Sequence, residues 1–105
     1  MEKQETLEKE YRTKRRVYEE QEEDLFIQRD KAISIIDEVQ DRSHYYLKDI
    51  VPEHDILMRG FRQTEKLRED LIDSTKEELK RLSRKIERLD ENYYRKLRKL
   101  NESEK

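Results

Sequence analysis

The chain has 105 residues, of which 50% are Asp, Glu, Lys or Arg and only 31% are apolar, yet its formal net charge is -2. One Gly, one Pro and no Cys exclude a disulfide framework, a thiolate zinc site and an ordinary mixed fold, which needs many turns. The balanced charge argues against nucleic-acid binding, which requires a basic face. Abundant Glu, Lys, Arg and Leu instead indicate long helices in a single domain.

Helical periodicity predicts a first helix over about residues 3–49. An apolar or aromatic residue recurs at every seventh position there, namely at Tyr11, Tyr18, Leu25, Ala32, Val39 and Tyr46. Seven residues complete nearly two helical turns, so these side chains form one stripe that predicts a seam for another helix. Val51 precedes Pro52 and is therefore disfavoured in a helix, which predicts a turn near 49–53.

A second helix is predicted over about residues 52–101, because Pro52 suits a first helical turn. Its stripe consists of Ile72, Leu79, Ile86, Tyr93 and Leu100. Gly60 indicates either close approach of another backbone or a loop that extends to that residue. The segment 73–77 resembles a capping box, but the unbroken seven-residue period favours a continuous helix.

Three blocks of charge in the first half have counterparts of opposite sign in the second half. The pairs are 19–24 with 80–85, 12–16 with 87–91, and 2–10 with 95–99. Paired positions add to roughly 103, the register of a chain folded once near Pro52. The apolar stripes give the same register, with Tyr11 opposite Tyr93. We therefore predict an all-α fold, in which residues 1–105 form one long, coiled-coil-like antiparallel two-helix hairpin.

Apolar residues between positions 25 and 39 exceed what one partner helix can cover. They spread over several sides of the helix, and the opposing segment 65–79 offers few apolar residues in return. A locally thicker hairpin core would use these residues, but a large apolar excess on a soluble protein favours a docking surface. The residues predicted to bind a partner are Leu25, Phe26, Ile33, Ile36, Val39 and Tyr46.

No catalytic, cofactor or metal motif is found. His44 and His54 are the only histidines, no Glu-x-x-His pair accompanies them, and a single Gly cannot build a phosphate loop. We therefore expect no enzymatic activity, no cofactor and no metal site. No apolar run is long enough for a membrane span and the N-terminus lacks an apolar signal segment, so we expect a cytoplasmic protein.

The segment 82–95, LSRKIERLDENYYR, together with the expected hairpin and the lack of Cys, resembles the Esx and WXG-like helical proteins of type VII secretion. The chain is more specifically similar to the LXG-associated alpha-helical (Lap) proteins of Gram-positive bacteria. That resemblance implies a targeting factor or chaperone that binds the helical LXG domain of a toxin effector. It also implies export together with that effector. The Trp-x-Gly turn of the family is absent, because the chain has no Trp.

Two other functions stay open from the sequence. The first is a structural coiled-coil protein that self-associates into an antiparallel four-helix bundle, because association commonly completes a thin core. Such a protein would be a homodimer in isolation, and a second small helical protein could take the same place. The second is a nucleic-acid-associated accessory factor that uses the basic residues between positions 80 and 99.

Overall fold

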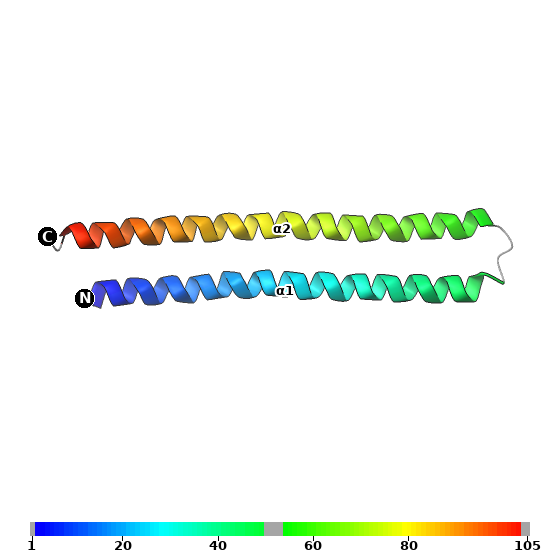
Figure 1. Cartoon of the computed structure of the whole chain (residues 1–105), viewed down its shortest axis with the longest axis horizontal. Coiled ribbons are helices and arrows are strands. Elements are labelled where there is room, and N and C mark those ends of the chain that lie inside the picture. The colour runs from blue at the N-terminus through cyan, green and yellow to red at the C-terminus, as the bar shows by residue number, and fades with distance from the viewer. Residues whose placement is uncertain (1, 50–53, 104–105) are drawn as a thin grey trace. The chain divides into compact units, whose positions relative to one another are not determined.

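The computed structural model describes residues 2–49 and 54–103, apart from the side chain of His54, and this part of the chain forms two helices and no strand. Helix α1 spans Glu2–Leu47 and α2 spans His54–Ser103 (Figure 1). The predicted all-α fold is confirmed. The first helix ends at Leu47 because Lys48 and Asp49 form a turn, in which the Lys48 N–H donates to the carbonyl of His44 at 3.1 Å. Residues 50–53 of the predicted turn, Pro52 among them, lie outside the described residues.

Helix α2 is continuous through Gly60 and through the segment 73–77, as the seven-residue period predicts. The loop does not extend to Gly60. A Cβ atom built on Gly60 would meet nothing within 4 Å, so this glycine marks no close backbone approach inside the chain. The buried Thr75 satisfies its hydroxyl by donating to the Leu71 carbonyl at 2.9 Å, one helical turn earlier.

The chain divides into two compact units, each of which contains part of α1 and part of α2. Unit 1 comprises Met1–Asp24 and Glu78–Lys105, and unit 2 comprises Leu25–Glu77. Within unit 1, the blue end of α1 lies beside the red end of α2, and the two run antiparallel (Figure 1). Within unit 2, Arg68 of α2 bonds to Asp37 of α1, at positions that add to 105 and so fit the register predicted for an antiparallel pair. That residues 1–105 form a single domain stays a prediction.

Unit 1 contains the one buried large hydrophobic residue of the described chain, Leu82, which is 6% exposed. Farther along the same helix pair, Tyr11 stacks on Tyr93 with ring centroids 4.1 Å apart and ring planes 13° from parallel. This is the cross-helix pair that the two apolar stripes predict, so the register is confirmed in unit 1. Stacked aromatic rings add roughly 0.5–1.5 kcal/mol to the apolar area that they bury.

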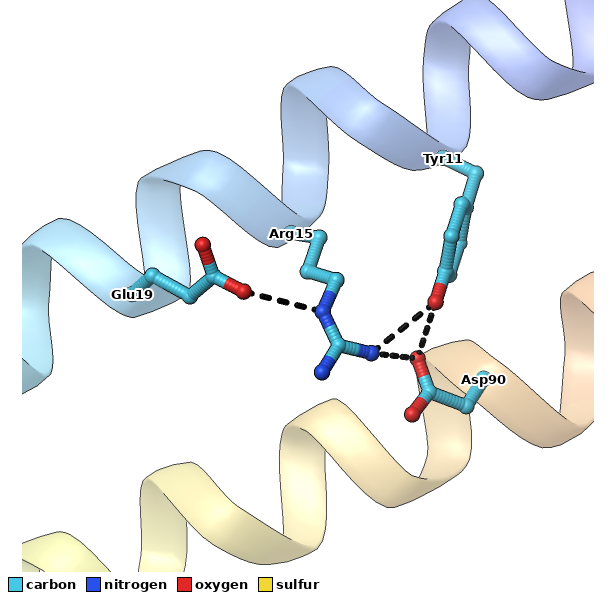
Figure 2. A network of polar contacts seen from close by, with 4 residues as sticks. All are labelled: Tyr11, Arg15, Glu19 and Asp90. Carbon is cyan, nitrogen blue, oxygen red and sulfur yellow. Dashed lines mark hydrogen bonds and ion pairs between the residues drawn. The ribbon is translucent and has the colours of Figure 1, made fainter.

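A polar network crosses the helix pair beside this stack (Figure 2). The Tyr11 hydroxyl and the Arg15 guanidinium both donate to Oδ1 of Asp90, each at 2.6 Å. The same guanidinium also donates to the Tyr11 oxygen and to Glu19, both at 2.9 Å. One carboxylate oxygen on α2 thus receives two donors from α1, which ties the helices together at a defined position.

The charge blocks form fewer contacts than their pattern suggests. Among the described residues, only the block pair 12–16 with 87–91 contributes an ion pair between helices, Arg15–Asp90. In the same described part of the chain, the acidic block 19–24 makes no ion pair to α2, and its Glu19 instead bonds to Arg15 within α1. An exposed ion pair is typically worth less than about 1 kcal/mol, so most of these side chains gain little from pairing.

Arg68, whose side chain is 22% exposed, makes polar contacts between the two helices of unit 2. Its guanidinium bonds to Glu65 on the same helix and crosses to Asp37 of α1. A longer contact of 3.3 Å reaches the side-chain oxygen of Gln40. The hydrogen bonds to Glu65 and Asp37 raise the pKa of Arg68 above its ordinary value and keep it charged.

Protonation of Asp90 is coupled to the stability of unit 1. Burial opposes ionisation of this carboxyl, but the hydrogen bonds from Tyr11 and Arg15 outweigh burial and hold the pKa of Asp90 below its usual value. The hydrogen bond to Asp90 in turn raises the pKa of Tyr11. Because folding lowers the pKa of Asp90, its stabilisation is complete above the unfolded pKa of about 3.9. That stabilisation is lost as the pH falls through the lower, folded value.

We expect Asp90→Asn to lower the free energy of unfolding by about 1 kcal/mol at neutral pH, since the two donors lose their charged acceptor. Below about pH 4 the difference from the wild type should shrink, because protonation of this carboxyl in the unfolded state removes the stabilisation that the lowered folded pKa provides. Urea denaturation across the acid range measures both effects. Glu91→Gln, at an exposed neighbour, is the control and should keep the wild-type profile. A constant difference at all pH values would contradict the proposed coupling.

Gly60→Ala should stabilise the protein by about 1 kcal/mol, because alanine is the better helix former and the added methyl group meets open space. Thermal melts followed by circular dichroism at low protein concentration test this. Ser83→Ala, at another exposed position of α2, should give a smaller gain. A destabilised Gly60→Ala variant would show that the backbone at this position is not an ordinary helix.

Candidate functional site

The large apolar side chains that stay exposed gather in unit 2. Among the described residues, unit 1 contributes only Val17 and Tyr94 to this class. The members in unit 2 are Phe26, Ile27, Ile35, Val39, Tyr45, Tyr46 and Leu47 on α1, and Ile56, Met58, Phe61 and Leu67 on α2. Both units are two-helix pairs of similar length, so the difference lies in composition and not in fold.

The six residues predicted to bind a partner fall into two groups. Three are exposed: Phe26 at 41%, Val39 at 56% and Tyr46 at 65%. The other three, Leu25, Ile33 and Ile36, are half-buried. The structure therefore leaves the first group accessible, whereas the second group is already partly covered within the chain. Partner binding itself stays a prediction for all six.

The exposed aromatic rings of α1 are supported by their own neighbours in sequence. The Arg29 guanidinium lies 5.1 Å from the centre of the Phe26 ring. Tyr45 and Tyr46 meet edge to face at 5.4 Å, and the Lys48 ammonium lies 5.2 Å from the centre of the Tyr45 ring. These contacts orient the rings but leave much of their surface in water, as expected of side chains that are free to enter an interface.

An open groove in unit 2 lies outside what the sequence predicted. Val39 and Leu47 line it from α1, and Ile56, Gly60 and Leu67 line it from α2. Leu67 is 57% exposed, although it belongs to the segment 65–79 that the sequence places opposite the first helix. The sequence contains a signal for this exposure, because Leu67 lies outside the seven-residue stripe that forms the seam of α2.

The described residues contain no group of three His, Asp or Glu side chains close enough to hold a metal ion. In that same part of the chain, neither helix has an apolar stretch of the length that crosses a bilayer. The site that remains is a surface of aliphatic and aromatic side chains on both helices of unit 2.

Comparisons with protein-family models, with curated proteins and with solved structures found no match for this chain. The function is therefore inferred from the surface of unit 2, together with the resemblance carried by residues 82–95.

Exposure in unit 2 predicts how substitutions affect folding. Val39→Ala should lower the free energy of unfolding by less than about 0.5 kcal/mol, because the side chain is already 56% exposed. Leu82→Ala should cost about 2 kcal/mol or more, because Leu82 is 6% exposed and its removal leaves a cavity. Chemical denaturation of both variants measures the difference. Equal costs would mean that Val39 is covered when the protein is in solution.

Proposed function

We propose that the chain is a non-enzymatic helical partner protein, and that it docks onto helices of another protein through the α1 side of unit 2. The observation that supports this function is the concentration of exposed large apolar side chains in that unit. Burying one such side chain gains roughly 1.5–3 kcal/mol. Contiguous apolar surface on a soluble protein commonly marks an interaction site.

The spacing on α1 favours a helix as the binding element. Val39 follows Ile35 by four residues, and Tyr46 follows Val39 by seven, so the three exposed side chains form one stripe along the helix. An amphipathic helix laid along that stripe would match its periodicity with its own apolar face. Two helices already packed together present such a groove more rigidly than a loop does.

We propose the helical LXG domain of a toxin effector as the partner, which makes the chain a targeting factor or chaperone for type VII secretion. The support for this identity is the resemblance of residues 82–95 and of the two-helix layout to the LXG-associated proteins. In this role the chain covers apolar helices of the effector before export. An isolated effector domain would otherwise expose that surface to aggregation.

The proposed function is tested with Ile35→Glu combined with Val39→Glu, both at exposed positions of that stripe. A pull-down against the purified N-terminal helical domain of an LXG effector should show binding weakened at least about a hundredfold, since two apolar contacts are lost. Circular dichroism should show unchanged helicity.

Val17→Glu is the matched control, because Val17 is 46% exposed but belongs to unit 1. This variant should bind like the wild type. Wild-type binding by the double variant would contradict the assignment of the α1 face. Failure of the wild-type chain to bind any LXG domain would contradict the identity of the partner.

A further inference from the structure

We propose that a strip along α2 of unit 2, centred on Leu67, binds the same strip of a second copy of this chain in antiparallel orientation. This surface goes beyond the proposed function, which uses the exposed side chains of α1, although Gly60 and Leu67 border the same groove as Val39. A variant on α1 outside the lining of that groove, such as Ile35→Glu, therefore distinguishes binding of a partner from homodimerisation.

The strip consists of Gly60, Leu67 and Ser74, which are seven residues apart and so lie along one side of α2. Leu67 is 57% exposed, and the positions on both sides of it are small and exposed. Space above Gly60 is open, since a Cβ there would meet nothing within 4 Å. Small residues around a single leucine allow two helix backbones to approach closely.

Charges beside the strip change sign along the helix. Arg59 and Lys66 precede Gly60 and Leu67 by one residue, whereas Asp70 and Glu77 follow Leu67 and Ser74 by three. Positions one before and three after a given residue lie on the same side of it on a helix. One edge of the strip is therefore basic in its first half and acidic in its second half, where Asp73 adds a further carboxylate.

This order of charges is complementary to itself only in the antiparallel orientation. With Leu67 of one copy on Leu67 of the other, Gly60 lies opposite Ser74, and the basic half of each strip lies beside the acidic half of its partner. A parallel pair would place the two charged edges on opposite sides of the interface, where they do not meet. The basic and acidic halves of this edge are complementary to each other, so a second copy of the chain matches both. We therefore assign a second copy as the occupant of the strip.

Contacts within the described part of the chain leave the charged side chains beside the strip available to a partner. Arg59, Lys66, Asp70 and Glu77 are all exposed, and within the described residues none takes part in an ion pair. The ion pairs of this part of α2 belong to Arg68 instead, which turns toward α1. Lys76, the one cation in the acidic half, lies nine residues past Leu67 and so on the opposite side of the helix.

Sedimentation equilibrium tests the strip itself. The wild-type chain should show a reversible dimer, and Leu67→Glu should weaken it at least about a hundredfold, because two carboxylates would meet at the centre. Met58→Glu is the control, since Met58 is 38% exposed but lies nine residues before Leu67, on the far side of α2. A wild-type chain that stays monomeric up to about 1 mM, or a dimer that Leu67→Glu leaves intact, would overturn the proposal.

Charge exchange tests the orientation of the partners. One variant carries Arg59→Glu and Lys66→Glu, and the other carries Asp73→Lys and Glu77→Lys. Each alone should dimerise about tenfold more weakly than the wild type, and a mixture of the two should recover the lost affinity as a heterodimer. The recovery should shrink at high salt. If both variants dimerise as the wild type does, the charges play no part and the proposal is wrong.

Cysteine crosslinking tests the register, because the chain has no Cys of its own. Gly60→Cys and Ser74→Cys should form an intermolecular disulfide when mixed, and neither should crosslink to itself. Efficient crosslinking of Gly60→Cys alone would indicate a parallel pair and overturn the antiparallel assignment. Ile35→Glu, on the α1 stripe but outside the lining of the groove that Leu67 borders, should leave dimerisation unchanged, which separates this surface from the one proposed for the partner.

Discussion

Burial between two helices is the interaction on which this structure depends, and it is limited in extent. A helix that packs against one other helix can cover only one stripe of its surface. Among the described residues only Leu82 and Thr75 are buried, and Thr75 is polar. A chain in which 50% of residues are charged supplies solvated side chains for the remaining faces. Apolar residues outside that stripe are therefore not covered by the other helix.

Unit 1 compensates for its thin core with specific contacts. The stacked pair Tyr11–Tyr93 and the two donors on Asp90 lie close together, so apolar and polar contacts fix the same helix register. Tyr11 takes part in both, through its ring and through its hydroxyl group. A sliding motion of one helix along the other would break both contacts together, which is how a few side chains define the register of two long helices.

Sequence alone predicted the two helices and the pairing of Tyr11 with Tyr93, because a seven-residue period is a property of the helix itself. Individual ion pairs were not predictable, since surface pairs are weak and Arg15 has both Glu19 and Asp90 within reach. Exposure within unit 2 was predicted only in part. The side of α1 that faces α2 decides whether Ile33 or Val39 is covered, and apolar residues surround α1 on several sides.

Because the facing sides of the helices are not known from the sequence, the groove lined by Val39 and Leu67 could not be predicted from either helix by itself. Its lining comes from both helices, and their relative rotation is set by the seam. Helix α2 confines its apolar residues to one side more strictly than α1 does. An apolar residue outside the α2 stripe, such as Leu67, is therefore a more specific signal than one on α1.

The two exposed surfaces of unit 2 differ in how they can select a partner. Beside the α1 face, charges are already matched within the helix, as in Arg29–Asp30 and Arg42–Glu38. Recognition there must depend on apolar contact and shape, which suits a helix of another protein. Beside Leu67 the charges are unmatched and change sign along α2. Electrostatic order of this kind contributes orientation and specificity more than affinity, and here the partner with the inverse order is the chain itself.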